Sequence, residues 1–299
     1  MYRSCKLCPR QCQVNREERN GACHVGAQIL VARAALHMWE EPCISGRNGS
    51  GTVFFAGCSL NCVFCQNRAI SRGQIGKSVS VERLADIFFE LKEQGAENIN
   101  LVTPDHYLPS VCDAIRKAKE SGINLPFICN CSGYETVESL RMLEGLIDIY
   151  LPDFKYWESE TAHRYSKAPD YPECARNAVK EMVRQVGECR FDENGMLKSG
   201  VVVRHLLLPG KVREAKQIVL YLYETYGDRV WLSLMNQYTP GEDAAVRLAG
   251  YPDLQRKVTV REYERWIRYA LNLGITNAFL QEGETASESF IPPFDLEGV

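Results

Sequence analysis

Residues 57–67 read Gly57-Cys58-Ser59-Leu60-Asn61-Cys62-Val63-Phe64-Cys65-Gln66-Asn67 and place three thiols in one short loop. Iron–sulfur clusters usually take four cysteine ligands. Three thiolates at this spacing suit three corners of an iron–sulfur cube and leave the fourth iron open to another molecule. Cys58, Cys62 and Cys65 are therefore predicted to bind an iron–sulfur cluster.

A structural zinc site, or three unrelated buried thiols, is the simplest alternative for this loop. Free cysteine is often a core residue, and zinc also accepts thiolates. The loop, however, follows directly on the apolar run Thr52–Ala56, which is typical of a β-strand. A ligand loop at the end of a strand favours the cluster over the alternatives.

The composition favours a metal-binding protein of the cytosol. The 299 residues include 13 cysteines, and no amino-terminal apolar stretch resembles a signal peptide. No apolar run approaches the ~18 residues of a membrane-spanning helix. The formal net charge of −3 gives no global attraction to nucleic acid or to an anionic membrane. We therefore expect a cytoplasmic protein that needs no membrane, and the charge does not favour nucleic acid as a partner.

Short apolar runs alternate with helical periodicity from residue 51 onward, which indicates βα units and a parallel sheet. The predicted strands are Thr52–Ala56, Ile99–Thr103, Phe127–Cys131, Ile147–Phe154, Val201–Leu208, Val230–Asn236 and a weaker Asn277–Gln281. The predicted helices are Val81–Glu93, Leu108–Glu120, Glu135–Leu143, Glu173–Val186, Lys211–Tyr226 and Arg261–Leu273. Six βα repeats are fewer than the eight of a closed barrel.

Polar motifs follow the predicted strands at their carboxyl ends, where barrel-like parallel sheets carry their chemistry. They are the cysteine loop, Thr103-Pro104-Asp105, Asn130-Cys131-Ser132-Gly133, Asp153-Phe154-Lys155 and Asn236-Gln237-Tyr238. We expect these segments to meet at one active face.

A second group of cysteines precedes the first predicted strand: Cys5, Cys8, Cys12 and Cys23. Four thiols in under thirty residues predict a metal site. Tetrahedral zinc is one candidate, because structural zinc sites take four protein ligands. A second iron–sulfur cluster is the other, since thiolates suit both metals. The spacing leaves the choice between them open.

The sequence predicts three regions along the chain. Residues 1–45 form a small cysteine-rich metal-binding segment, residues 46–288 the barrel, and residues 289–299 a carboxyl-terminal tail. The prolines of the tail favour an extended path. Because Phe290 and Phe294 are unusual in a disordered end, we expect the tail to dock on the barrel.

The chain resembles the pyruvate formate-lyase activating enzyme group of the radical S-adenosylmethionine (SAM) superfamily, most closely its uncharacterised branch, over nearly its whole length. The segments that carry the resemblance are the loop at 57–67, Thr103-Pro104-Asp105-His106-Tyr107, Cys129-Asn130-Cys131-Ser132-Gly133-Tyr134, Leu151-Pro152-Asp153-Phe154-Lys155, Arg204-His205-Leu206-Leu207-Leu208-Pro209-Gly210 and Met235-Asn236-Gln237-Tyr238. The resemblance implies an α/β fold, a partial (β/α)6 barrel, in which Cys58, Cys62 and Cys65 hold a [4Fe-4S] cluster.

The resemblance also implies the chemistry. SAM would bind the open iron, and one electron, delivered by a reductant such as flavodoxin or ferredoxin, would cleave it to methionine and a 5′-deoxyadenosyl radical that abstracts hydrogen from a substrate. A glycyl-radical-enzyme activase is the leading hypothesis. Modification of another protein or peptide, of a metabolite or of a nucleic acid stays open, because a fold does not fix a function. An iron–sulfur electron carrier and a zinc-knuckle binding module are the alternatives from other classes.

Six polar residues are candidates for contacts with SAM or the substrate: Asp105, Asn130, Asp153, Lys155, Arg204 and Asn236. Members of the group carry Gly-Gly-Glu where this chain has Thr103-Pro104-Asp105, so Asp105 keeps a carboxylate for the SAM ammonium while Pro104 removes a backbone donor. Asp153 and Lys155 share one face of a strand. They could also form no more than a surface ion pair.

Overall fold

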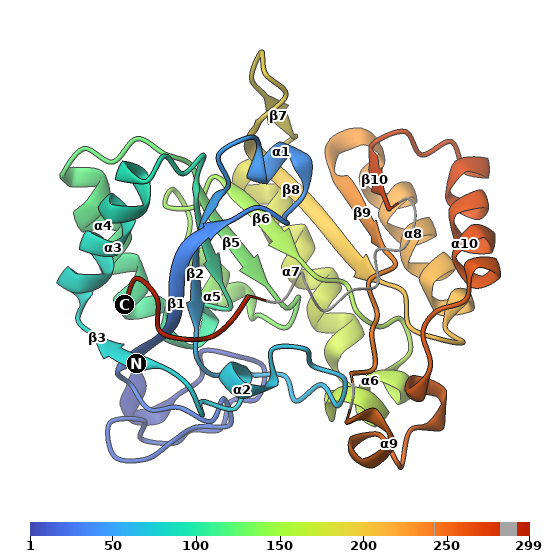
Figure 1. The fold of residues 1–299 in the computed structure, drawn as a ribbon, viewed down its shortest axis with the longest axis horizontal. Coiled ribbons are helices and arrows are strands. Elements are labelled where there is room, and N and C mark those ends of the chain that lie inside the picture. Colours follow the sequence, from blue (N-terminus) through green and yellow to red (C-terminus); the bar gives the residue numbers. More distant parts are fainter. Residues whose placement is uncertain (242, 282–291) are drawn as a thin grey trace.

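The strands of the chain join into one sheet, and the computed structural model describes residues 1–241, 243–281 and 292–299. The strands are β1 (Ile29–His37), β2 (Ser50–Phe55), β3 (Lys77–Val79), β4 (Ile99–Val102), β5 (Phe127–Cys131), β6 (Ile149–Pro152), β7 (Arg190–Phe191), β8 (Leu197–Leu206), β9 (Trp231–Met235) and β10 (Ala278–Leu280). Their spatial order is β10-β9-β8-β6-β5-β4-β2-β1-β3, and β7 pairs with β8 (Figure 1).

Helices connect the strands. They are α1 (Pro42–Ser45), α2 (Arg68–Ser71), α3 (Val81–Glu93), α4 (Leu108–Glu120), α5 (Val137–Arg141), α6 (Ser159–Ser166), α7 (Tyr171–Val186), α8 (Val212–Tyr226), α9 (Ala244–Arg247) and α10 (Val260–Asn272). Short 3-10 helices form at η1 (Tyr2–Ser4), η2 (Asp105–Tyr107), η3 (Gly227–Arg229) and η4 (Pro252–Gln255).

The parallel part of the sheet consists of strands β2, β4, β5, β6, β8, β9 and β10. Each runs parallel to its neighbours within this set. Each step from one of them to the next passes through at least one helix, which gives six βα repeats in the described part of the chain. β1 pairs antiparallel with β2, and β3 antiparallel with β1. The arrangement confirms the predicted α/β fold, a partial (β/α)6 barrel.

The long helices form where the sequence supplies both an apolar face and end signals. In α3, Ser80 caps the first turn by accepting a hydrogen bond from the backbone N–H of Arg83. Its buried residues Leu84, Ile87, Phe88 and Leu91 follow the helical period. Helix α10 begins with a capping box between Thr259 and Glu262.

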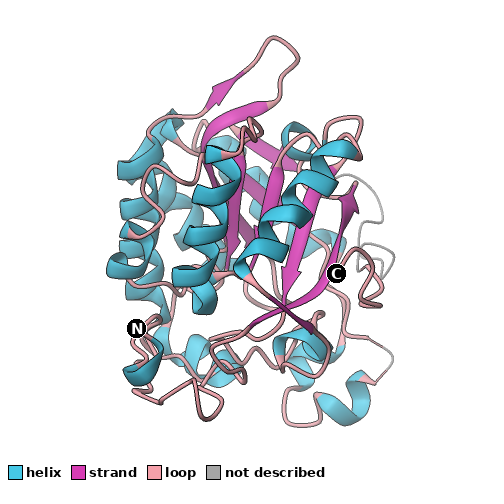
Figure 2. Cartoon of the chain, turned by 90° about the vertical axis from the view of Figure 1, so that its left-hand side faces the viewer, coloured by secondary structure: helices cyan, strands magenta, loops and turns pink. Residues whose placement is uncertain are grey.

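Most helices pack on one side of the sheet, as Figure 2 shows. The main core lies between the sheet and these helices, and it contains fully buried aromatic side chains such as Phe88, Phe127 and Trp266. Strand β5 is buried at all five positions, as expected of a central parallel strand.

The predicted elements agree closely with the structure. Helices α3 and α4 and strand β5 have the predicted bounds, and the other predicted elements are present with ends shifted by up to four residues. The prediction did not include strands β1, β3 and β7 or helices α1, α2, α6 and α9. Of these, β1 lies inside the predicted segment 1–45 and yet belongs to the sheet. Strand β1 was missed because the prediction started at residue 51, and α6 because its eight residues carry a short apolar stripe.

The end of the chain runs beside β1. Backbone hydrogen bonds join Leu296 N–H to Ala32 and Ala34 N–H to Glu297. Phe294 packs edge-on against Phe54, with ring centroids 5.5 Å apart. Residues 292–299 therefore dock on the sheet (Figure 1), whereas Phe290 and the predicted boundary at 289 lie outside the described residues.

The helices that the structure describes are all too short or too polar to cross a membrane.

Candidate active site

Two adjoining cavities, of about 270 and 160 Å³, lie at the carboxyl ends of the parallel strands. They share a set of lining residues that includes most of the predicted site: Cys62, Cys65, Asn130, Asp153, Lys155 and Arg204. Cys58 and Cys131 line the smaller cavity. The structure thus brings the cysteine loop and the polar strand ends to one place, as the sequence predicted.

The cysteine loop leaves β2 through a turn that requires glycine. Gly57 has φ = +93°, and a Cβ there would lie 2.7 to 2.9 Å from atoms of Val25, His106 and Cys23. A larger residue would push the amino-terminal segment away from the loop. Further along, the N–H of Val63 donates to the carbonyl of Tyr165 at 2.8 Å. Contacts with the rest of the chain therefore fix the loop at its start and at Val63.

The three thiols of the loop, Cys58, Cys62 and Cys65, all line the smaller cavity. Burial raises the pKa of Cys58 well above its ordinary value, and the charges of Cys62 and Cys65 raise it further. Burial and Cys62 also raise the pKa of Cys65. A bound metal cation would favour the thiolate forms of these side chains. The donor set fits a [4Fe-4S] cluster with one open iron.

Two hydroxyl groups hold the thiols of the loop in place. Ser166 Oγ donates to Cys62 Sγ at 3.0 Å, and Ser71 Oγ lies 3.5 Å from Cys65 Sγ. Hydrogen bonds to ligand sulfurs help to set the potential of iron–sulfur clusters. Sequence reasoning missed both serines, because they lie on α2 and α6 without a motif of their own.

Phe64 anchors the loop between its second and third cysteines. Its ring meets the rings of Tyr156, Tyr165 and Tyr238 edge-on, with centroids 6.1 to 6.4 Å apart. Edge-to-face contacts of this kind stabilise beyond the area that they bury. The aromatic residue before the third cysteine thus fixes the loop against the barrel.

Arg204, at the end of β8, is the centre of a charged network in the cavity. Its Nε lies 3.2 Å from Asp153 Oδ1 and its Nη1 lies 3.3 Å from Glu40 Oε2. Its Nη2 donates to Asn130 Oδ1 at 2.5 Å. These side chains are largely withdrawn from water. The single guanidinium group therefore offsets the charge of two buried carboxylates and links the segments that carry Glu40, Asn130 and Asp153.

Lys155 adds a second positive charge to this network by pairing with Asp153. Burial works against ionisation of both groups, but the charges of Lys155 and Arg204 hold the pKa of Asp153 below its usual range. Burial lowers the pKa of Lys155, but the charge of Asp153 and then that of the nearby Cys62 act in the opposite direction, and the pKa is raised overall. The lysine therefore stays positive beside the thiols and is available to an anionic group.

Glu40 is a further site residue that sequence reasoning missed. Its Oε1 accepts hydrogen bonds from Asn100 at 3.0 Å and Asn130 at 3.2 Å. Burial raises its pKa, while the charge of Arg204 opposes the shift. The only sequence signal is a pair of acids at 40 and 41 after an apolar run, and its partner Arg204 lies far along the chain.

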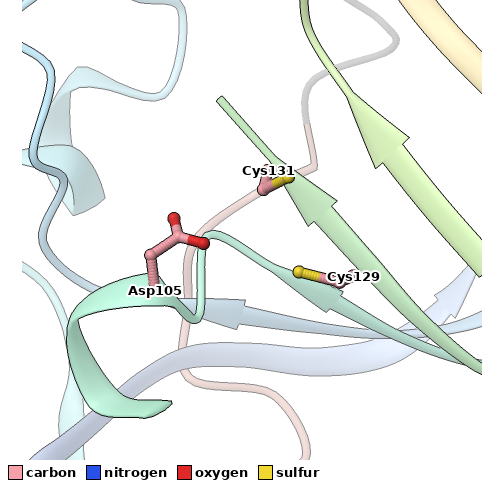
Figure 3. Close-up of side chains that lie close together, drawn as sticks. All are labelled: Asp105, Cys129 and Cys131. Carbon is pink, nitrogen blue, oxygen red and sulfur yellow. The ribbon is translucent and has the colours of Figure 1, made fainter. Parts of the chain in front are cut away.

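Asp105 lies beside this cavity without lining it. It is 1% exposed, and neither carboxyl oxygen has a hydrogen-bond partner among the described residues. Its carboxyl group points toward Cys129 and Cys131 (Figure 3), and the three ligand atoms lie within 4.8 Å of one another. Burial and the charge of Glu135 raise its pKa well above the usual range. The neighbouring Thr103, with φ = +58°, faces the cavity instead.

Asn236 also lies outside the cavity lining, although it follows β9 directly. Its neighbours Met235 and Gln237 line the larger cavity. The backbone N–H of Asn236 donates to Gln281 Oε1 at 2.6 Å, and its own side-chain oxygen is buried. Asn236 is therefore next to two residues that line the cavity but does not line the cavity itself.

The four amino-terminal cysteines gather beside the cysteine loop. Cys5, Cys8 and Cys23 are 4 to 6% exposed. Burial raises the pKa of Cys8 to about 12, and the charges of Cys23, Cys5 and Cys12 add to the shift. Arg16, 2% exposed, has its Nη1 3.8 Å from Cys5 Sγ. The four thiols therefore lie close enough for their charges to influence one another.

Gly133, after β5, allows the ends of β5 and β6 to approach each other. It has φ = +78°, and a Cβ there would collide with the carbonyl oxygen of Asp153. We expect Gly133→Ala to destabilise the protein more than Gly122→Ala. Gly122 has φ = +92° but no atom within 4 Å of the position that a Cβ would take. Gly122→Ala should therefore lower the free energy of unfolding only through the strained backbone conformation, by about 1–2 kcal/mol. Equal urea midpoints for the two variants would contradict the close approach.

Protonation of His205, which is 4% exposed, is expected to lower the free energy of unfolding in mild acid. Burial lowers its pKa to about 4, below the ~6.5 of an unfolded histidine. The free energy of unfolding is therefore at its full value above pH 6.5 and decreases as the pH falls toward 4, because the unfolded chain binds the proton more readily. The decrease is about 1 kcal/mol at pH 5.5. His205→Gln should remove this part of the difference in unfolding free energy between pH 7.5 and 5.5. The exposed control His163→Gln should keep it, and equal pH dependence of the two variants would contradict the prediction.

The chain is similar to known proteins in sequence and in fold. The model of the radical SAM superfamily matches residues 52–222, which is more than half of the chain. An uncharacterized protein of Methanocaldococcus jannaschii is 28% identical over 277 residues, which cover 90% of this chain and 75% of the relative.

Among solved structures, SuiB of Streptococcus suis bound to the precursor peptide SuiA matches with a TM-score of 0.50 and 12% identity, over 76% of this chain and 47% of SuiB. HydG, a maturase of the [FeFe]-hydrogenase, matches with a TM-score of 0.47 and 16% identity, over 71% of this chain and 46% of HydG. This chain spans about half the length of either protein, and the likeness to SuiB concerns the fold. Because the family model covers more than half of the sequence, the protein belongs to the radical SAM superfamily.

Proposed function

We propose that Cys58, Cys62 and Cys65 bind the [4Fe-4S] cluster and that SAM and the substrate occupy the adjoining cavities. Membership of the superfamily implies both cofactors and SAM-cleaving radical chemistry. The single observation that carries the assignment of residues is that all three thiols and the polar strand ends line connected space. When bound, the cluster supplies the electron that cleaves SAM and releases a 5′-deoxyadenosyl radical.

The polar side chains of the cavity have separate tasks in this proposal. Lys155 offers an ammonium group to a carboxylate or another anionic group of SAM or of the substrate. Arg204 holds Asn130 and Asp153 at fixed positions through its direct contacts. Asp153, kept ionised by its two cationic neighbours, is able to accept from the amino group of SAM. The chain thereby presents both charges that an amino acid moiety requires.

Asp105 and Asn236 act in this proposal from behind the cavity. Asp105 lies next to Cys131, which faces the cavity, and Asn236 lies between two lining residues. Each would influence ligands through these neighbours. Their predicted contacts with SAM therefore stay a prediction.

We further propose that the substrate is a glycine residue of a partner protein, so that the enzyme is a glycyl-radical-enzyme activase. The support is the resemblance of six motifs to the pyruvate formate-lyase activating enzyme group. A flavodoxin or a ferredoxin would supply the electron. Modification of another peptide or of a small metabolite is the alternative, and a peptide is favoured by the neighbour SuiB, whose structure holds a precursor peptide.

Electron paramagnetic resonance tests the activase proposal. Anaerobically reconstituted protein would be mixed with SAM, a reductant and pyruvate formate-lyase, and the sample would be examined for a glycyl radical. A radical that appears only with all components supports the activase. Formation of 5′-deoxyadenosine without a glycyl radical would contradict an activase of pyruvate formate-lyase and leave the radical SAM assignment intact.

We also propose that Cys5, Cys8, Cys12 and Cys23 bind a second iron–sulfur cluster. Zn–S bonds of about 2.3 Å place the sulfurs of a tetrahedral site roughly 3.8 Å apart. Among the described residues, only Asp105, Cys129 and Cys131 bring three ligand atoms within 4.8 Å of one another. The amino-terminal thiols are spaced more widely, as the three thiols of the loop are. Zinc in stoichiometric amount, found by metal analysis, would contradict the cluster.

A further inference from the structure

The amino-terminal segment touches the cysteine loop directly at the first ligand of the cluster. The backbone N–H of Cys58 donates to the carbonyl of Cys23 at 3.1 Å. This bond joins a residue of the amino-terminal thiol group to a residue of the loop through one main-chain contact. Gly57 provides the space, because a Cβ there would lie 2.9 Å from the same carbonyl.

Two further contacts hold the next residues of the loop. Arg10 Nε donates to the carbonyl of Ser59 at 3.0 Å, and His24 Nε2 lies 2.8 Å from Asn61 Oδ1. Arg10 also bonds the carbonyl of Ser166, the residue whose hydroxyl contacts Cys62. The contacts therefore cover the stretch between the first and the second ligand of the loop.

The residues that make these contacts lie next to the amino-terminal thiols in the sequence. Arg10 lies between Cys8 and Cys12 in the sequence, and His24 follows Cys23. The segment before β1 has little regular structure of its own, with η1 as its helical turn. In segments of this kind, metal binding supplies the free energy of folding. A metal at the four thiols would therefore fix Arg10 and the Cys23 carbonyl where the loop needs them.

We propose that the amino-terminal metal centre is a brace for the loop that binds the SAM cluster, so that loss of its metal weakens the hold of Cys58, Cys62 and Cys65 on iron. This inference rests on the proposed metal centre. Arg10, the Cys23 carbonyl and His24 act as positioning groups, because they contact the loop and not its ligand sulfurs. Outer contacts that orient metal ligands typically change metal affinity about 10- to 100-fold.

Two variants test the brace. Cys8→Ser removes one amino-terminal ligand, and Arg10→Ala removes the contact to Ser59 while leaving all seven thiols in place. Cys174→Ser, a half-buried thiol on α7, is the matched control. The readout is the rate at which an iron chelator abolishes the SAM-responsive electron paramagnetic resonance signal of the reduced protein under anaerobic conditions.

We expect the signal to disappear roughly 10- to 100-fold faster in both variants than in the control, by analogy with other outer contacts. Unchanged rates in Arg10→Ala, with the full metal content of the control, would overturn the brace while leaving the metal centre in place. A protein that lacks Cys58, Cys62 and Cys65 tests the centre separately. If it retained no iron and no zinc, the amino-terminal centre would be refuted, and the brace with it.

Discussion

Cys58→Ala is expected to lose the SAM cluster and to form no detectable 5′-deoxyadenosine. Cys58 is one of three proposed ligands, and it faces the smaller cavity in a loop that already lacks a fourth thiol. With two thiolates left, the loop has only half of the usual set of four cysteine ligands. Iron content and product formation, measured on the same anaerobic sample, check the prediction.

The matched control for this variant is Cys174→Ala, which removes a thiol on α7 outside both cysteine groups. It should keep the cluster and the activity. Product formation by Cys58→Ala at the rate of the control would show that the loop is not the ligand set. Retention of some iron by Cys58→Ala is compatible with the account, because the amino-terminal thiols stay intact.

Arg204→Ala is expected to have the largest effect on stability. It leaves the carboxylates of Asp153 and Glu40 without the cation that lies within 3.3 Å of both. Removing one partner of a buried ion pair typically costs about 3–5 kcal/mol, because the remaining charge stays desolvated. Anaerobic urea unfolding measures the difference from the unmodified protein.

Arg116→Ala is the control for Arg204→Ala, because Arg116 forms an exposed ion pair with Asp113 on α4. Exposed pairs contribute little to stability, so this variant should unfold at nearly the same urea concentration as the unmodified protein. Equal unfolding midpoints for the two variants would mean that the Arg204 network does not stabilise the fold. A double variant Arg204→Ala with Glu40→Gln should recover part of the loss, since it removes one unpaired charge.

Local sequence patterns were sufficient to predict most of the fold. Helices α3 and α4 combine a helical apolar stripe with clear end signals, Ser80 at the start of α3 and Gly122 after α4. Strand β5 is short, apolar and bounded by turn residues. Because parallel strands end at one edge of a sheet, the convergence of Asn130 and Asp153 followed from the order of the elements.

The parts of the site that could not be predicted depend on contacts across the chain. Glu40 reaches the cavity because β1 pairs with β2 and the chain after β1 then turns toward β4 and β5. There Glu40 meets Asn100 and Asn130. Asp105 turns into the barrel within η2 and not toward the cavity. Side-chain direction after a strand is set by local backbone geometry, and the motif Thr103-Pro104-Asp105 does not specify it.

The contact between the two cysteine groups was likewise invisible in the sequence. It depends on main-chain atoms of Cys23 and Cys58 and on the absence of a side chain at Gly57. Main-chain hydrogen bonds between loops carry no residue signature. A glycine directly before the first cysteine of the loop is the one sequence feature that agrees with such a close approach.

Formation of 5′-deoxyadenosine tests the central claim most directly. The reconstituted protein would be incubated anaerobically with dithionite and SAM, and the nucleoside would be quantified against Cys58→Ala, with iron counted in both samples. The account predicts 5′-deoxyadenosine from the unmodified protein and none from the variant. A protein with a full iron complement that binds SAM and yet forms no more 5′-deoxyadenosine than the variant, with or without candidate substrates, would contradict it.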